Sequence, residues 1–491
     1  MISLFGTFSI FLSLYILARS SARYRIWEHI YHTLAMVLSP FIYNLWFEPI
    51  PSLKTDCKYW CPNYLWKIEW GSETFWLSVA NYVFVYMYLA SLVRMLILFK
   101  RKMVTNLFLR LFVYIPAANF STIMLIAFVP SLLIRILFVG QFSKNWIIFV
   151  VFAIIAPFCI IGSLQTLFTF ETSFSTVMGV GKKKIKSKKN EKPNLAVRNN
   201  SRRFSKRKAN KIVSRKSPNS DGEWNQIKII QITDPHLGPW MSAKRFKKIC
   251  QRSVDRNPDI IVITGDMLTV ESMNPKGFKD LSEGMSPFKK MKGRVFACIG
   301  NHDEECLVGV EKAFLDNDII YLKDQEHLLE LDNFNVQILG IGNITSQKVT
   351  RVCQKFPPNS RADLRIVLLH DPTEFKYIPP NEKSLVLSGH THGGWFGLNF
   401  LGIPYSLLDF GTLGQNFYEY GENLLYVHRG TGVYGWPMRT GTGGEQSMMN
   451  VYFESDIKKN NLNSSSERNT DEQLISKSEK SSFGSNSSTS D

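Results

Sequence analysis

The chain has 491 residues, 20% of them charged, and a formal net charge of +17 at pH 7. This length exceeds that of most single domains, so at least two parts are expected. Residues 182–216 alone contain 16 lysines and arginines against one acid. Most of the net positive charge therefore lies in this one segment, and the rest of the chain is nearly neutral. The seven cysteines are scattered, and this spacing argues against a disulfide scaffold in the second half of the chain.

The first 170 residues contain apolar stretches long enough for a membrane. Several reach the roughly 20 residues that cross the hydrocarbon core, and they lie near 1–18, 33–47, 75–99, 107–138 and 146–169. The fourth is long and contains Pro116, Pro130 and Arg135, so five spans are expected and six is the alternative. The first stretch lacks a basic beginning and a clear cleavage site, so we expect it to be retained. We therefore predict an all-α, multi-pass transmembrane domain over residues 1–170, with about five helices.

Basic residues predict the orientation of these spans, because Lys and Arg collect on the cytoplasmic side. The loops after the first, third and fifth stretches are basic, whereas the second loop is balanced in charge and rich in tryptophan. Within that second loop Cys57 and Cys61 lie close together, as a disulfide or as two free thiols. Five spans place the N-terminus outside and everything after Phe170 in the cytoplasm.

Residues 171–224 are expected to form a basic disordered linker, since they hold too few apolar residues to bury a core. The 182–216 segment begins shortly after the fifth stretch, which favours an anionic lipid surface over nucleic acid as its partner. Residues 456–491 are rich in Ser, Asn, Lys and Glu, and are expected to be a disordered polar tail.

Between residues 225 and 455, short apolar runs alternate with polar stretches that suit helices. The runs are rich in Val and Ile, have the length of buried strands, and lie at 227–233, 259–264, 294–299, 335–341, 364–369, 384–388 and 424–428. Residues 241–257 have the charges and spacing of an amphipathic helix. This alternation predicts an α/β domain.

Polar side chains directly follow five of these runs. They are Asp234 and His236, Asp266, the sequence Asn301-His302-Asp303, His370, and His390 with His392. Ligands of open α/β sheets bind beyond the carboxyl ends of the strands, so these tips are expected to converge on one crevice. Glycines flank the last histidine pair in the sequence SGHTHGG, which indicates a loop at a strand end rather than a regular strand.

A metal site is expected at this crevice. Its candidate ligands are Asp234, His236, Asp266, Asn301, His370, His390 and His392. Carboxylates and imidazoles without thiolates suit manganese, iron or zinc, and argue against a structural cysteine-type zinc. Seven ligands exceed the needs of one such ion, whereas two ions that share a bridging carboxylate would use them all.

The order of these motifs resembles that of a known superfamily. The series Asp-Pro-His, Gly-Asp, Gly-Asn-His-Asp, a single His and Gly-His-Thr-His is similar to the signature of the calcineurin-like metallophosphoesterases. With the apolar stretches before it, the chain resembles the transmembrane proteins that carry such a domain. The resemblance implies a two-sheet αββα sandwich with a dinuclear metal centre, in which manganese is expected first, with iron or zinc as alternatives.

The resemblance also implies a role for each motif residue. Two sets of three residues would each hold one ion: Asp234, His236 and His392, and Asn301, His370 and His390. Asp266 would bridge the ions. His302 matches the histidine that contacts the phosphate and protonates the leaving oxygen, and Asp303 would orient it. Relatives often have Gln where this chain has Trp395, which puts one substrate contact in doubt, and residues 428–439 resemble their glycine-rich final loop.

The expected function is that of a membrane-anchored phosphoesterase that hydrolyses a phosphate ester or anhydride by attack of metal-bound hydroxide. Its substrate would be a phosphorylated small molecule or a lipid-linked phosphate. One alternative is a regulatory or scaffold domain that binds metal without catalysis, and another is a metal-dependent nuclease. A transporter with a regulatory domain is a third, supported only by Arg94 and Arg135 in or beside apolar stretches.

Overall fold

The computed structural model describes the chain in separate ranges: 30, 33–39, 42, 73–99, 107–137, 150–178, 205–207, 224–342, 346–394, 397, 413–434 and 439–454. Several features of the sequence prediction lie outside these residues. They are the first apolar stretch, the pair Cys57 and Cys61, Trp395, the tail 456–491 and most of the basic segment 182–216.

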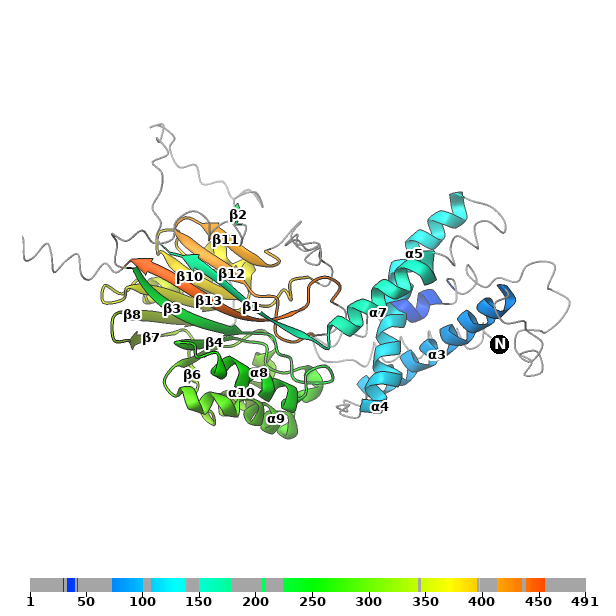
Figure 1. Cartoon of the computed structure of the whole chain (residues 1–491), viewed down its shortest axis with the longest axis horizontal. Coiled ribbons are helices and arrows are strands. Elements are labelled where there is room, and N and C mark those ends of the chain that lie inside the picture. Colours follow the sequence, from blue (N-terminus) through cyan, green and yellow to red (C-terminus); the bar gives the residue numbers. More distant parts are fainter. Residues whose placement is uncertain are drawn as a thin grey trace, which may run out of the picture.

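The described apolar helices correspond largely to the third, fourth and fifth apolar stretches. They are α3 (Glu73–Phe99), α4 (Leu107–Leu109), η3 (Arg110–Tyr114), α5 (Ile115–Leu137), η4 (Val150–Ile155) and α7 (Ala156–Gln165). One helical segment, Arg110–Ile134, is long and apolar enough to cross a membrane, and the shorter apolar helices Tyr82–Ile97 and Ala153–Gln165 accompany it. Among the described residues there is thus one candidate span, fewer than the five predicted. Figure 1 shows these helices grouped at one side of the sheets.

Two sheets form the rest of the described chain. The first has the strand order β1-β13-β3-β4-β5-β6, with the bounds Thr169–Val177, Gly444–Glu454, Trp224–Ile232, Ile260–Thr264, Val295–Cys298 and Ile320–Tyr321. The second has the order β2-β11-β12-β10-β9-β8-β7, with the bounds Ser205–Arg207, Asn416–Tyr420, Asn423–Val427, Ser384–Ser388, Leu364–Leu369, Asn335–Ile341 and Gln325–Glu330. Each of the seven apolar runs predicted as strands is a strand.

Apolar side chains of both sheets meet in one layer, which includes Ile229 and Val262 from the first sheet and Ile366 and Leu385 from the second. Three helices, α8 (Ala243–Asp255), α9 (Pro275–Met285) and α10 (Leu307–Leu315), cover the outer face of the first sheet. Helix α11 (Ser346–Lys355) packs on the outer face of the second. The predicted two-sheet α/β sandwich is therefore confirmed for this part of the chain.

Local sequence explains these elements. All side chains of β4, Ile-Ile-Val-Ile-Thr, are buried because the sheet is covered on both faces. Helix α8 begins after Ser242, whose hydroxyl oxygen accepts a hydrogen bond from the amide of Arg245 at 3.3 Å. The helix then buries Phe246, Ile249 and Cys250 at helical spacing against the first sheet.

Strand β1 differs from the prediction, which placed the start of a disordered linker at residue 171. β1 pairs in parallel with β13. Its Phe174 packs with ring centroids 5.3 Å from Phe417 and 4.8 Å from Tyr426. The sequence Thr-Phe-Glu-Thr-Ser-Phe-Ser-Thr-Val is too polar on average to stand out as a strand, although Phe170 and Phe174 share one face of it. The first residues of the expected linker therefore belong to the sheet.

The register places the carboxyl ends of the central strands beside the apolar helices. β1 begins at Thr169, shortly after α7 ends, and Thr169 pairs with Gly444 at the start of β13. Ser447, near that start, pairs with Gln231 near the end of β3. Since β4 and β5 run parallel to β3, their carboxyl ends lie at the same edge. The loops expected to bind metal therefore lie at the end of the sandwich that is next to the apolar helices, near α7.

Candidate metal centre

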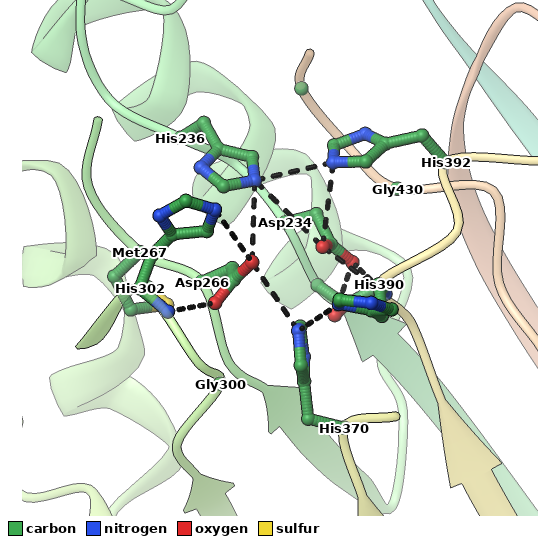
Figure 2. A network of polar contacts seen from close by, with 12 residues as sticks. Asp234, His236, Asp266, Met267, Gly300, His302, His370, His390, His392 and Gly430 are labelled. Atoms are coloured by element: carbon green, nitrogen blue, oxygen red, sulfur yellow. Dashed lines mark hydrogen bonds and ion pairs between the residues drawn. The ribbon is translucent and has the colours of Figure 1, made fainter. Parts of the chain in front are cut away.

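The polar residues predicted at five strand ends come together in one cluster. Asp234 and His236 follow β3, Asp266 follows β4, Asn301 to Asp303 follow β5, His370 follows β9, and His390 and His392 follow β10. Figure 2 shows Asp266 at the middle of this cluster, with the imidazoles of His236, His302 and His370 around it. The convergence predicted for these strand ends is thus present in the structure.

The backbone at these positions is strained. Five of the candidate ligands have a left-handed φ: Asp234 at 51°, His236 at 44°, Asp266 at 59°, His390 at 69° and His392 at 53°. Such conformations cost on the order of 1–3 kcal/mol each in non-glycine residues, and they gather at functional sites. Asp and His tolerate them better than most residue types.

Motif glycines make room for the carboxylates. A side chain at Gly389 would collide with Oδ2 of Asp234, and one at Gly300 would collide with Oδ1 of Asp266. Gly265, with a φ of +94°, packs its backbone against that of Gly300. The glycines beside the ligands are therefore required by close approach as well as by turn geometry.

The first group of ligand atoms comes from Asp234, His236 and His392, whose ligand atoms all lie within 4.8 Å of one another. Nε2 of His392 is 3.2 Å from Nε2 of His236 and 3.6 Å from Oδ1 of Asp234. Asp234 is fully buried, and its carboxylate accepts hydrogen bonds from the hydroxyl of Thr233 at 2.8 Å and from the amide of His390 at 3.0 Å. These bonds fix the carboxylate toward the two imidazoles.

The second group comes from Asp266, His370 and His390, again within 4.8 Å. Nε2 of His370 is 3.3 Å from Oδ2 of Asp266 and 3.3 Å from Nδ1 of His390. The same Oδ2 lies 3.6 Å from Nε2 of His236 in the first group. One carboxylate oxygen therefore faces both groups, as a bridging ligand would.

Backbone contacts orient the second group. Nδ1 of His370 is 2.6 Å from the carbonyl oxygen of Thr264, so this nitrogen donates and Nε2 is the ring nitrogen that faces the cluster. Below it, Nε2 of the buried Gln231 donates to Oγ1 of Thr264 at 2.9 Å and to the carbonyl oxygen of Ser388 at 3.0 Å. Gln231 thus ties β3, β4 and β10 together beneath the site, and links the two sheets.

The carboxylate of Asp303 contacts the backbone on both sides of Asp266 and at Gly300. Its Oδ2 accepts hydrogen bonds from the amides of Asp266 at 2.7 Å and Gly300 at 3.0 Å, and its Oδ1 accepts one from the amide of Met267 at 2.8 Å. Residue 303 is fully buried at the start of a 3₁₀ turn, η8 (Asp303–Cys306). Its carboxylate therefore clamps the loop that carries Asp266, and its expected role in orienting His302 stays a prediction.

Burial and neighbouring charges set the protonation of the cluster. Burial lowers the pKa of His236 to about 3 and holds the pKa of His392 well below its usual value, with the charge of Arg439 adding to the second shift. Both imidazoles are therefore neutral at pH 7, as metal ligands must be. Burial alone would lower the pKa of His370, but Asp266 and Asp234 raise it to about 10. The carboxylates of Asp266 and Asp234 therefore stabilise a positive charge beside them. A bound cation would supply that charge in place of the proton on His370.

The donor set fits a pair of divalent cations. Its carboxylate oxygens and imidazole nitrogens are those that manganese, iron and zinc accept, and thiolates are absent from both groups. Oδ1 of Asn301 is buried and has no hydrogen-bond partner. A buried amide oxygen without a donor is costly, and a cation would satisfy it.

Two further residues lie against the centre, and the sequence did not single them out. Arg439 is 1% exposed, and its guanidinium donates to the carbonyl oxygens of Arg429 at 2.7 Å and Gly432. Its Nη2 is 2.7 Å from Nδ1 of His392, which accepts because guanidinium only donates. The proton of neutral His392 is then on Nε2, and a cation bound there would displace it. Arg439 lies in a glycine-rich loop, where no hydrophobic periodicity marks a residue as buried. The sequence indicated only that it belongs to the predicted final loop, residues 428–439.

Tyr434 is the second such residue. Its ring centroid is 4.2 Å from that of His302 and 4.8 Å from that of His236, so the tyrosine covers one side of both imidazoles. The sequence placed Tyr434 only within residues 428–439, the predicted glycine-rich final loop.

Comparison with known proteins identifies the family. The family model for calcineurin-like phosphoesterases matches residues 227–394. The chain is 29% identical over 218 residues to phosphodiesterase YaeI of Escherichia coli, which covers 43% of this chain and 77% of that protein. It is 32% identical over 226 residues to an uncharacterized metallophosphoesterase of Aquifex aeolicus, covering 44% of this chain and 80% of that one.

A transmembrane protein with metallophosphoesterase domain from Danio rerio is 27% identical over 244 residues, covering 45% of this chain and 52% of that protein. This chain therefore matches about half the length of that relative. The family match, the two bacterial relatives and the ordered strand-end motifs agree. The chain belongs to the calcineurin-like phosphoesterases, a family of metal-dependent phosphoester hydrolases.

Proposed function

We propose that this chain is a membrane-anchored phosphoesterase that uses two divalent metal ions to hydrolyse a phosphate ester or anhydride. The observation that carries the proposal is the position of Asp266, whose Oδ2 lies 3.6 Å from Nε2 of His236 and 3.3 Å from Nε2 of His370. A single carboxylate oxygen between two ligand groups is the arrangement that a dinuclear centre requires.

The proposed ligands divide between the two ions as the two groups do. Asp234, His236 and His392 would hold one ion, His370, His390 and Asn301 would hold the other, and Asp266 would serve both. When bound, two such ions polarise a phosphoryl group and activate a water molecule for in-line attack. Manganese is the proposed metal, with iron or zinc as alternatives, because the donors are carboxylate and imidazole.

The chain's own residues would supply the proton and the geometry. His302 is 6% exposed, and its Nε2 lies 4.0 Å from Oδ2 of Asp266. From there it could give a proton to the leaving oxygen of a phosphate held at the centre. Its amide donates to Oδ1 of Asp266 at 2.9 Å, which fixes the distance between the proton donor and the bridging carboxylate.

The membrane part of the proposal rests on the apolar helices. Large apolar side chains are exposed along them, including Val83 and Leu89 on α3, Leu133 on α5 and Ile161 on α7. Such a surface is costly in water and suits lipid. We propose the five-span, multi-pass arrangement with the catalytic domain in the cytoplasm. We also propose that segment 182–216 lies on anionic lipid, and that a lipid-linked phosphate is one candidate substrate class.

A metal reconstitution experiment tests the proposed function. The metal-free full chain in detergent would be loaded with Mn²⁺, Fe²⁺, Zn²⁺ or Mg²⁺ and assayed on p-nitrophenyl phosphate and bis(p-nitrophenyl) phosphate. Asp266→Asn should lose most bound metal and nearly all activity, because both ions share this carboxylate. Asp255→Asn at the end of α8 is the control and should change neither. Two metals per chain in the Asp266 variant would refute the bridging role.

A further inference from the structure

A small pocket beside the metal centre is built jointly by the apolar helices and the catalytic loops. Arg94 of α3 and Tyr114 of η3 line it from one side, and Trp240, Glu271 and Tyr434 line it from the other. Its place follows from the topology, because the carboxyl ends of the central strands lie on the helical side.

Buried contacts hold the two sides of this pocket together. Tyr114, Trp240 and Val433 form one apolar cluster, in which each side chain is at most 5% exposed. Helix α7 is joined to the final loop as well. The amide of Arg439 donates to the carbonyl oxygen of Gly162 at 3.0 Å, and the amide of Gly441 donates to Oε1 of Gln165 at 3.0 Å. The helices therefore form a fixed wall near the catalytic loops.

Tyr434 connects the pocket to the proposed proton donor. Its ring lines the pocket and lies 4.2 Å from the ring of His302, centroid to centroid. A group that receives a proton from His302 must lie next to that imidazole. The leaving group of a bound phosphate would therefore extend past Tyr434 toward Arg94.

Arg94 gives the pocket its chemical character. It is 1% exposed and is the one charged residue in the apolar segment Tyr82–Ile97 of α3, and its guanidinium carbon lies 5.0 Å from the centre of the Tyr114 ring. A charged side chain on such a helix is costly, and where one occurs it typically faces a cavity and marks a substrate path. Guanidinium binds phosphate and carboxylate through two parallel hydrogen bonds. Glu271 is the acid on the opposite wall, and it is partly exposed to solvent.

We propose that this pocket is the leaving-group subsite, and that Arg94 binds an anionic group carried by the leaving group. The substrate class is then a phosphate ester or anhydride whose leaving group bears its own phosphate or carboxylate. This inference rests on the proposed function, because His302 defines the leaving side. The pocket is narrow, so the subsite requires the partly exposed ring of Tyr434 to turn aside when the anionic group binds.

Matched substrates test the subsite. The full chain in detergent with Mn²⁺ would be assayed on 3-phosphooxypropionate and on propane-1,3-diol monophosphate, and on the methyl phosphodiesters of both. The two leaving groups have similar length, but only the first carries a carboxylate. We expect kcat/KM to be roughly 10–100-fold higher for the carboxylate-bearing esters, mostly through KM, which is the range of a charge-assisted hydrogen bond.

Variants separate the subsite from a purely structural role for Arg94. Arg94→Gln should bring the two kcat/KM values together, and Arg94→Lys should keep part of the preference. Glu271→Gln removes the negative charge of the opposite wall and should increase the preference, which keeps the test open if Arg94→Gln does not fold. Arg252→Gln is the control, because Arg252 is a half-exposed arginine that pairs with Glu171, and it should leave the ratio unchanged.

The outcomes distinguish this inference from the proposed function. Equal kcat/KM for the neutral and anionic leaving groups would overturn the subsite, and so would an unchanged ratio in Arg94→Gln or a ratio that Glu271→Gln does not raise. If the metal-loaded wild type hydrolyses none of the four esters or the aryl phosphates, the proposed function itself fails.

Discussion

Replacing Asp303 with asparagine separates two roles that its position in the sequence could support. In the structure its carboxylate accepts three backbone hydrogen bonds, from Asp266, Gly300 and Met267, at 2.7, 3.0 and 2.8 Å. The amide of asparagine has the same shape but only one acceptor oxygen. At least one buried N–H group must therefore lose its partner in Asp303→Asn.

The size of the effect follows from these contacts. A buried N–H group without a partner costs about 1–3 kcal/mol, and each remaining bond loses roughly 1 kcal/mol when the acceptor is no longer charged. Burial, with the charge of Asp266, raises the pKa of Asp303 to about 7. The buried charge is thus itself costly, and removing it recovers part of the loss. We expect the free energy of unfolding to fall by about 2–4 kcal/mol, and the loop that holds Asp266 to release metal.

Urea unfolding of the metal-free protein and metal analysis of the loaded protein measure these two effects. Asp259→Asn is a matched control, because its carboxylate accepts one backbone hydrogen bond, from Lys228 at 2.6 Å, at the opposite end of β4 from Asp266. We expect it to cost about 1 kcal/mol and to keep its metal. If Asp303→Asn retained full stability and both metals but lost activity, the clamp would be refuted and the orientation of His302 restored as its role.

Three further predictions concern the proposed metal centre and the membrane topology. His302→Ala should keep both metals and slow hydrolysis of alkyl phosphates by about 10²–10⁴-fold, with a much smaller defect on nitrophenyl esters; equal defects on both would contradict a general acid. Chelation of the metals should lower the unfolding midpoint, since a ligand at 100 times its Kd contributes about 2.7 kcal/mol; an unchanged midpoint on calorimetry would show that no folded-state metal is bound. A protease added to intact cells should spare a C-terminal tag, as five spans require, and cleavage of the tag would mean an even span count or the opposite orientation.

The sequence was sufficient to predict the central strands and the residues at their ends. Buried parallel strands are continuous apolar runs, so β4 and β9 are visible in a short window. Because their carboxyl ends share one edge of a sheet, the polar residues that follow them had to come close together. The clustering of Asp266 with His370 was therefore predictable without side-chain coordinates.

Strand β1 could not be found in the same way. Its partner β13 pairs Thr169 with Gly444, and no local pattern links segments so far apart in the chain. Its apolar residues, Phe170 and Phe174, alternate with Thr, Ser and Glu, and the strand follows an apolar helix almost at once. Composition placed the domain boundary at 171 for this reason, whereas pairing places the strand within the sheet.

The direction of side chains on the loops was the second feature that the sequence could not predict. The resemblance implied that Asp303 orients its neighbour His302, and nothing in the sequence indicated a second contact. In the 3₁₀ turn the carboxylate of Asp303 points to the loop after β4. Arg439 reaches His392 across 47 residues of chain. Both contacts depend on how loops fold back over the strand ends, which residue spacing does not encode.

The strained backbone explains why the loops that carry the candidate ligands need additional hydrogen bonds to hold their conformation. Five left-handed ligand residues cost on the order of 1 kcal/mol or more each, which is a large part of the roughly 5–15 kcal/mol that stabilises a typical domain. Local propensity would relax them, and specific contacts hold at least two of them in place. The amide of His390 is held by Asp234, and the amide of Asp266 is held by Asp303. Gly389 and Gly300 leave no room for a side chain beside these carboxylates, so the carboxylates can pack directly against the neighbouring backbone. The geometry of the centre is therefore imposed by the sandwich and its clamps, and the strand ends supply only the donor atoms.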